Sequence, residues 1–303
     1  MLGTIGSAAR GRRLDTADDT FGWLRTSDDV AGEPAALRER LAQDGYLYVA
    51  GLLDREAVQA ARSELLGVVA AHGAAALRQD YPMSSEAMRG VLQGEQMLGF
   101  FAALLGGAVR SYDFIWLRSQ PTSHGVDPHC DLVFMGRGTP DVLTCWTPFG
   151  DIPLRGGGLM LLEDSHRSSP VRLADYLRQD VDTYCENGPN ADAVRTGAMH
   201  WEHWQQPGPG KAWGGEITRD AHALREQWGG RWLTAPEYRM GDVLVFTMTT
   251  VHAGTDNETG SLRLSTDSRY QRADAAIDDR WIRGAHGEAP IAHGLAAKQG
   301  KIC

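Results

Sequence analysis

The chain has 303 residues, of which 42% are hydrophobic and 23% charged, and it contains 36 glycines against 13 prolines. This composition is typical of a soluble globular protein, with the glycine content of a turn-rich β fold. A formal charge of −9, without any long lysine or arginine run, argues against a nucleic-acid partner.

The ends and the cysteines indicate an intracellular setting. Arg10, Arg12 and Arg13 form a small basic group that no apolar core follows, so we expect neither a signal peptide nor a membrane span, and predict a cytoplasmic protein. The cysteines lack CxxC spacing and are predicted to be free thiols. They are Cys130, Cys145, Cys185 and Cys303.

The first third of the chain is predicted to be mainly helical. Residues 1–31 are polar and irregular and are interpreted as a flexible arm. Apolar residues at helical spacing from 33 end at Asp44-Gly45 and precede a short strand over 46–49. Further helices are predicted from Asp54 to Gly73 and from Ser85 to Leu105.

From residue 109 the pattern is that of short strands separated by turns. Strands are predicted over 112–118, 142–146, 159–162, 243–246 and 262–270. Together with the preceding helices they predict a mainly β fold, a jelly-roll barrel buttressed by N-terminal helices.

A long insert at about 168–237 separates two groups of these strands, and we interpret it as a partly helical lid. It holds five tryptophans, which are Trp201, Trp204, Trp213, Trp228 and Trp232. Most of them should pack the insert against the barrel, and one or two could line a substrate pocket.

His129-Cys130-Asp131 is the first candidate metal-binding motif. On a strand, residues two apart face the same way, so His129 and Asp131 could bind one metal ion while Cys130 is buried on the other side. His252, after the apolar run 243–246, is the candidate third ligand. Two histidines and a carboxylate on one face are the arrangement of non-haem Fe(II) oxygenases. Alone, His-x-Asp is common, and a solvated histidine beside a turn aspartate is the competing interpretation.

A candidate carboxylate-binding group follows His252. Arg263, Ser265 and Asp267 share one strand face, where the arginine can offer a bidentate fork and the serine a further donor to an acidic cosubstrate. The alternative is a salt bridge between Arg263 and Asp267 on a solvated face.

These motifs, in this order and spacing, resemble the phytanoyl-CoA dioxygenase family of Fe(II)- and 2-oxoglutarate-dependent oxygenases, which have a double-stranded β-helix (cupin-like) core. The resemblance covers roughly residues 35–285. It is carried by the following residues: His129-x-Asp131, Trp146 to Pro153, Gly157-Gly158-Leu159 running into Asp164-Ser165-His166, His252 and Arg263.

The resemblance implies roles for individual residues. His129, Asp131 and His252 would be the catalytic iron ligands, and Arg263 would bind the distal carboxylate of 2-oxoglutarate. Ser265 and Trp146 match positions that help to form the cosubstrate pocket. His166 lies outside the triad, in a turn where Asp164 replaces the usual glycine, and is expected to be structural.

The implied reaction is hydroxylation of an unactivated C–H bond of a small organic substrate, interpreted as a specialised metabolite, with O2 and 2-oxoglutarate as cosubstrates and succinate and CO2 as products. Asp131 is retained where related halogenases have a small residue, which favours hydroxylation or a related oxidation over halogenation. The competing hypotheses are a cupin-like Zn or Mn isomerase or hydrolase, which would not need Arg263, and a catalytically silent metal-binding module.

The resulting division is a flexible arm over 1–31, a single oxygenase domain over 32–290 and a tail over 291–303. Nothing in the sequence indicates an oligomeric state. Pocket-lining residues are expected from 112–118, 132–137 and 200–232. His124 is either a substrate contact or an exposed loop residue, and His200 and His203 are interpreted as lid packing or substrate contacts.

Overall fold

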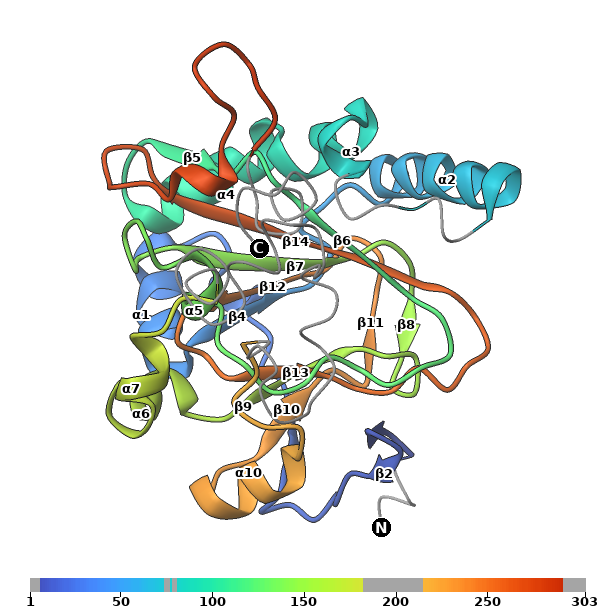
Figure 1. The fold of residues 1–303 in the computed structure, drawn as a ribbon, viewed down its shortest axis with the longest axis vertical. Coiled ribbons are helices and arrows are strands. Elements are labelled where there is room, and N and C mark those ends of the chain that lie inside the picture. Colours follow the sequence, from blue (N-terminus) through green and yellow to red (C-terminus); the bar gives the residue numbers. More distant parts are fainter. Residues whose placement is uncertain (1–5, 74–76, 78–80, 182–214, 291–303) are drawn as a thin grey trace, which may run out of the picture.

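The structure is a computed structural model that describes residues 6–73, 77, 81–181 and 215–290. Two sheets face each other, and helices cover the outer face of the larger one (Figure 1). This is the predicted jelly-roll, double-stranded β-helix architecture with buttressing helices.

The larger sheet has the order β4-β12-β7-β14-β5, with β6 also paired to β14, and all its pairs are antiparallel. Its strands are β4 (Tyr46–Val49), β5 (Val109–Ser111), β6 (Trp116–Gln120), β7 (Leu143–Pro148), β12 (Val243–Thr247) and β14 (Arg263–Arg272).

The smaller sheet has the order β13-β9-β10-β3, in which only the β10 to β3 pair is parallel. Its strands are β3 (Phe21–Trp23), β9 (Leu159–Leu162), β10 (Trp232–Thr234) and β13 (His252–Gly254). Two short ribbons pair β1 (Ala8–Ala9) with β2 (Arg12–Arg13) and β8 (Ile152–Pro153) with β11 (Glu237–Tyr238).

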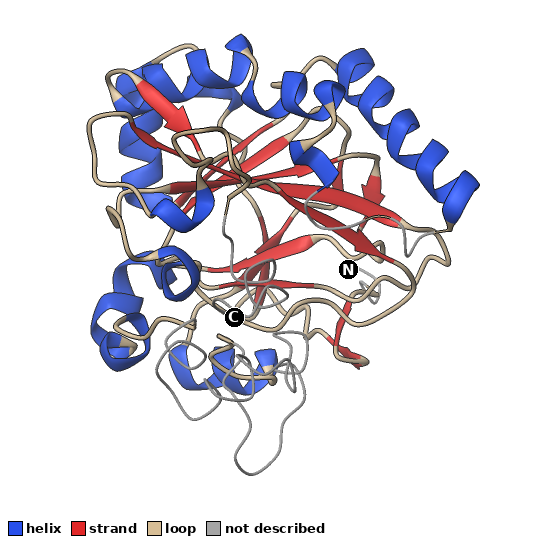
Figure 2. Ribbon diagram, turned by 45° about the horizontal axis from the view of Figure 1, so that its top comes forward, coloured by secondary structure: helices blue, strands red, loops and turns tan. Residues whose placement is uncertain are grey.

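Figure 2 shows the helices gathered over the larger sheet and at the periphery of the smaller one. The α-helices are α1 (Pro34–Asp44), α2 (Arg55–His72), α3 (Glu86–Gln93), α4 (Glu95–Leu105), α5 (Leu132–Met135), α6 (Ser165–Arg172), α7 (Ala174–Leu177) and α10 (Ala221–Trp228). Short 3-10 turns are η1 (Asp28–Val30), η3 (Tyr81–Met83) and η5 (Asp279–Trp281). Among the described helices, none combines the length and the apolar character that crossing a bilayer requires.

The sequence of β12 is a continuous apolar run over 243–246 because both faces of this strand are buried. Val243 and Val245 pack toward the helices, in one cluster with Leu47 of β4. Leu244 and Phe246 point the other way, into the space between the two sheets. A strand covered on both faces needs apolar residues at every position.

The predicted helix from Ser85 to Leu105 is two helices, α3 and α4, divided at Gly94. The backbone of Gly94 is extended, at φ −74 and ψ 174, which ends the helical hydrogen-bond ladder. A Cβ atom at this position would lie 2.2 Å from the carbonyl oxygen of Gly90. The close approach of these two backbones therefore requires glycine.

The predicted strand over 112–118 is observed only in its last part, because β5 ends at Ser111 and β6 begins at Trp116. Between them the amide of Phe114 donates to the carbonyl of Trp281, at 3.1 Å, instead of to a neighbouring strand. The alternation of apolar residues over 112–118 therefore reflects burial of these side chains, and not continuous hydrogen bonding to a neighbouring strand.

The chain before α1 differs from the expected irregular arm. Phe21–Trp23 forms β3, the edge of the smaller sheet, beside β10. At three residues, this segment is too short to show the alternation by which a strand is recognised.

The proposed insert at 168–237 overlaps the barrel, because β10 lies within the smaller sheet. Trp232 is buried, and its indole N–H donates to the carbonyl of Ala221 at 3.0 Å. Arg172 lies over the ring of Trp228, 5.5 Å from its centroid. These two tryptophans pack as expected. Trp201, Trp204, Trp213, His200 and His203 lie outside the described residues, as do Cys185 and Cys303.

Candidate metal centre and pocket

The three predicted metal ligands lie together in the barrel. One donor atom from each of His129, Asp131 and His252 lies within 4.8 Å of the others, and all three residues are buried. Asp131 Oδ1 is 3.8 Å from the Nε2 atom of His129 and 3.7 Å from that of His252. In the part of the chain that the structure describes, this is the one cluster of three such donors.

The backbone that presents the first two ligands differs from the prediction. His129 makes an isolated antiparallel bridge to His252, and Asp131 has helical backbone angles at the start of α5. The two side chains therefore converge because the chain turns after Cys130, and the prediction that they share a strand face is wrong. Cys130 is buried, as expected, and its thiol lies 3.4 Å from the carbonyl of Thr249.

The histidine rings are oriented by the backbone. His129 Nδ1 lies 2.7 Å from the carbonyl of Asp127, and His252 Nδ1 lies 3.1 Å from the carbonyl of Thr250. A carbonyl can only accept, so each Nδ1 carries the proton and each Nε2 keeps its lone pair for a ligand bond.

Burial keeps both imidazoles neutral. Desolvation, reinforced by the nearby His252, lowers the pKa of His129 to about 3, and desolvation lowers the pKa of His252. Neutral imidazole is the form that binds a metal ion. The donor set, two neutral nitrogens and one carboxylate, thus fits an iron(II) ion.

Asp131 remains ionised despite its burial. Desolvation opposes the charge, but the charge of Arg269, together with the hydrogen bond from Thr144, holds the pKa of Asp131 below its ordinary value. Its Oδ2 atom accepts hydrogen bonds from the hydroxyl of Thr144 and from Arg269. The carboxylate therefore has one oxygen bound to protein donors and the other facing the histidines.

Strand β14 carries a row of polar side chains toward the same space. Arg263 donates to Ser265 Oγ at 2.5 Å and to the Oε1 atom of Gln120. Its Nε has no hydrogen-bond partner among the described residues, and burial lowers the guanidinium pKa to about 10. Asp267 pairs with Arg118, at 2.7 Å, so the alternative salt bridge between Arg263 and Asp267 does not form.

Of the three predicted cosubstrate residues, Arg263 lines the pocket, and Trp146 and Ser265 do not. The ring of Trp146 packs against Tyr238 at 4.7 Å between centroids. Ser265 is fully buried behind Arg263.

A cavity of about 560 Å³, within the range of small-molecule sites, opens onto the metal ligands His129 and Asp131. Its inner wall contains His129, Asp131, Arg263 and Arg269. Further lining residues come from the expected segments 112–118 and 132–137, and they are Trp116, Leu117, Arg118, Phe134 and Met135. Glu216 and Arg219 add charged side chains from the insert.

Three residues of this site were not identified from the sequence, namely Gln120, Thr144 and Arg269, whereas Arg118 lies in a segment that was expected to line the pocket. Arg269 continues the alternation of Arg263, Ser265 and Asp267, and Thr144 precedes Trp146 by two residues. Their faces were therefore predictable, but their partners depend on the strand register.

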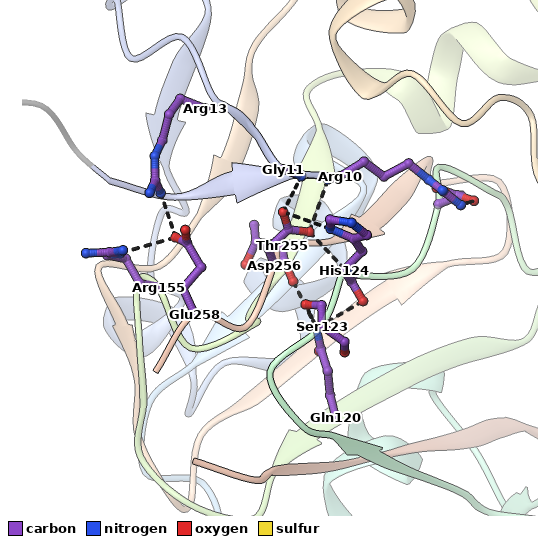
Figure 3. Close-up of polar contacts among 12 residues, drawn as sticks. Arg10, Gly11, Arg13, Gln120, Ser123, His124, Arg155, Thr255, Asp256 and Glu258 are labelled. Carbon is purple, nitrogen blue, oxygen red and sulfur yellow. Dashed lines mark hydrogen bonds and ion pairs between the residues drawn. The ribbon is translucent and has the colours of Figure 1, made fainter. Parts of the chain in front are cut away.

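The N-terminal segment contributes Arg10 to the pocket lining. Figure 3 shows the polar contacts that this segment makes with the rest of the protein. Buried Asp256 accepts hydrogen bonds from the backbone amides of Arg10, Gly11 and Gly125, at 3.0, 2.6 and 3.1 Å. His124, exposed at the mouth, lies 3.3 Å from Asp256. The N-terminal segment is thus joined to the loop that follows His252.

Side-chain ion pairs strengthen this attachment. Arg10 binds both oxygens of Asp127, two residues before His129. Arg13 and Arg155 share Glu258, at 2.6 and 3.2 Å. Both segments that supply histidine ligands are therefore linked to the N-terminal segment.

His166 lies outside the metal cluster, with Nε2 3.2 Å from the carbonyl of Ala42. It packs against Gly45, where a Cβ atom would lie 2.3 Å from the imidazole. These contacts agree with the structural role expected for His166.

The fold and the site define a class, the jelly-roll proteins with a buried facial site of two histidines and one carboxylate. A sequence model described as phytanoyl-CoA dioxygenase (PhyH) matches residues 41–265, so the chain belongs to the phytanoyl-CoA dioxygenase family and is an Fe/2-oxoglutarate oxygenase-type enzyme.

Solved structures share the fold. The non-heme alpha ketoglutarate dependent epimerase SnoN from nogalamycin biosynthesis is 22% identical, with a TM-score of 0.53 and coverage of 81% of this chain and 86% of SnoN. The carbocyclase SnoK from the same biosynthesis is 16% identical, with a TM-score of 0.56 and coverage of 87% and 90%. EctD from S. alaskensis is 16% identical, with a TM-score of 0.55 and coverage of 94% and 93%. No curated protein sequence matches the chain.

Proposed function

We propose that this protein is an Fe(II)- and 2-oxoglutarate-dependent dioxygenase that hydroxylates an unactivated C–H bond of a small organic substrate, a specialised metabolite. The observation that carries the proposal is that His129, Asp131 and His252 converge, and that two of these ligands, His129 and Asp131, line one cavity together with the guanidinium of Arg263. A metal site alone would also suit an isomerase or hydrolase. A second, buried cation in the same cavity is what an acidic cosubstrate requires.

The residues have distinct tasks. His129, Asp131 and His252 hold the iron, which supplies the activation of O2 when it is bound. Arg263 binds the distal carboxylate of 2-oxoglutarate, with Ser265 fixing its guanidinium. A solved structure of SnoN is described as a complex with Fe3+, alpha ketoglutarate and nogalamycin RO, and one of HygX as having nickel and 2-oxoglutarate bound.

Arg263 is prepared for this task by its surroundings. Gln120 and Ser265 hold two of its nitrogens, and the buried Nε keeps an unused donor. Trp146 does not line the cavity, and we assign it a supporting role through its packing on Tyr238. Arg118 and Trp116 on the cavity wall are assigned to the substrate.

Anaerobic addition of Fe(II) and 2-oxoglutarate tests the proposal directly. The complex should show a weak metal-to-ligand charge-transfer band in the visible range. Arg263→Ala should bind 2-oxoglutarate at least 30-fold more weakly, because truncation of a buried charge partner costs about 2 to 5 kcal/mol. Arg55→Ala, which breaks an exposed ion pair to Asp151, is the matched control and should bind normally. A wild-type protein without the band, or unchanged binding by Arg263→Ala, would refute the assignment.

Turnover is then followed by succinate release, and Asp131→Ala should be inactive. Structural neighbours named as an epimerase and a carbocyclase make it necessary to analyse the products as well as the succinate. A product with one added oxygen supports hydroxylation. An isomer or a ring-closed product would replace hydroxylation with that reaction while leaving the metal and cosubstrate assignments intact.

A further inference from the structure

We propose that Thr144 and Arg269 act as positioning residues, which hold one oxygen of Asp131 so that the carboxylate presents only the other oxygen to the metal ion. The inference rests on the metal site of the proposed function. It concerns residues that act on the metal ion through Asp131.

The two oxygens of Asp131 have different surroundings. Oδ1 faces the Nε2 atoms of His129 and His252, at 3.8 and 3.7 Å. Oδ2 points away from them, accepts the hydroxyl hydrogen of Thr144 and lies 3.0 Å from Arg269 Nη2. A carboxylate that is free to rotate can bind a metal ion through either oxygen or through both. One whose Oδ2 is already bound offers Oδ1.

The two residues that donate to Oδ2, Thr144 and Arg269, belong to neighbouring strands of the larger sheet. Thr144 of β7 lies directly opposite Arg269 of β14 in the antiparallel register, so their side chains leave the sheet on the same face and are neighbours. Thr144 is fully buried and the Arg269 side chain is 2% exposed. Rigid strands therefore set the position of both donors.

Among the described residues, Asp131 is the carboxylate with which the Arg269 guanidinium forms an ion pair. The guanidinium lies over the ring of Trp116, 4.9 Å from the centroid, where a cation–π interaction stabilises it. Its Nε and Nη1 have no hydrogen-bond partner in the described part of the chain. Burying two unpaired donors costs stability, so a guanidinium placed mainly to stabilise the fold would have more partners than this one.

Outer-shell partners of metal ligands contribute strongly to binding, and their loss typically reduces metal affinity or activity about 10- to 100-fold. Thr144→Val removes the hydroxyl at nearly constant shape and constant charge, so it isolates orientation. Arg269→Met removes the charge and the donor together. Arg269→Lys keeps the charge without the planar fork.

The test is titration of each purified protein with Co(II), with folding checked by circular dichroism. Thr144→Val and Arg269→Met should bind Co(II) about 10-fold or more weakly than the wild type, and Arg269→Lys should lie between. The visible Co(II) spectrum should also change in shape and intensity, since the coordination of Asp131 changes. Arg40→Met is the matched control, because Arg40 is a buried arginine paired with Asp29 away from the metal. It should bind Co(II) within twofold of the wild type.

Folded Thr144→Val and Arg269→Met proteins with wild-type Co(II) affinity and spectrum would overturn the inference while leaving the proposed function in place. An equal loss in Arg40→Met would overturn it as well, since general destabilisation would then be the cause. If Arg269→Met does not fold, Thr144→Val decides alone. A wild-type protein that binds no Co(II) would refute the metal site, and with it both proposals.

Discussion

The amide of His129 donates to the carbonyl of His252, and the amide of His252 donates back to the carbonyl of His129, both at 3.0 Å. These main-chain bonds join the two ligand segments independently of any metal. The metal site is therefore largely formed before a metal ion binds, and the protein should remain folded after treatment with a chelator.

We expect the metal-free protein to unfold cooperatively and to gain stability on metal addition. Ni(II) at 100 times its dissociation constant should stabilise the folded state by about 2.7 kcal/mol, through binding to the native state alone. Thermal unfolding with and without Ni(II) measures this gain. His252→Ala should show no comparable shift, and loss of the folded state on chelation would contradict the prediction.

Gln120→Leu should weaken 2-oxoglutarate binding although Gln120 is not expected to touch the iron. The substitution removes the acceptor of one Arg263 N–H and leaves a buried charged donor unpaired, at a cost of about 1 to 3 kcal/mol. We expect roughly a tenfold higher KM for 2-oxoglutarate, with little change in metal affinity. An unchanged KM would show that Arg263 is positioned without Gln120.

Asp256→Ala should detach the N-terminal segment from the pocket mouth. It removes the acceptor of three backbone amides, including those of Arg10 and Gly11. We expect a loss of about 2 to 4 kcal/mol in the free energy of unfolding and faster proteolysis before residue 15. Asp274→Ala removes an exposed ion pair to Arg272 and should cost less than about 1 kcal/mol. Equal effects of the two variants would contradict the attachment.

Gly45→Ala tests the contact between the end of α1 and His166. Gly45 has φ +75, and an added Cβ would lie 2.3 Å from the imidazole. The backbone should cost about 1 kcal/mol and the overlap about 1 to 3 kcal/mol more. Gly51→Ala has φ +62 with nothing within 4 Å, so it reports the backbone cost alone. His166→Ala in the Gly45→Ala protein should recover the difference. Without that recovery, the strain lies elsewhere.

Structure and site were predicted most accurately where the residue types themselves indicate the environment. The runs in β4 and β12 are apolar at every position because both faces are covered, and this places the larger sheet correctly. His129, Asp131 and His252 were identified by residue type and order, although the backbone at Asp131 turns into α5 rather than continuing a strand.

Partners that depend on strand register could not be predicted. The face of Arg263 and Asp267 was expected, but only the pairing of β14 with β6 and β7 brings Arg118 to Asp267 and Thr144 beside Arg269. Trp146 lies opposite Asp267 in this register but does not line the cavity. β3 has only three residues, and the N-terminal segment is attached through residues that are distant in the sequence, so neither could be predicted from a local pattern.

The alternation of side chains along β14 limits how the length of this strand can change, in a designed variant or in evolution. Arg263 and Arg269 face the cavity together because an even number of steps separates them along one strand. Insertion or deletion of a single residue between them would turn one of the two arginines toward the helices. The length of this segment can therefore change only in steps of two, or with a compensating bulge, if both arginines are to keep facing the cavity.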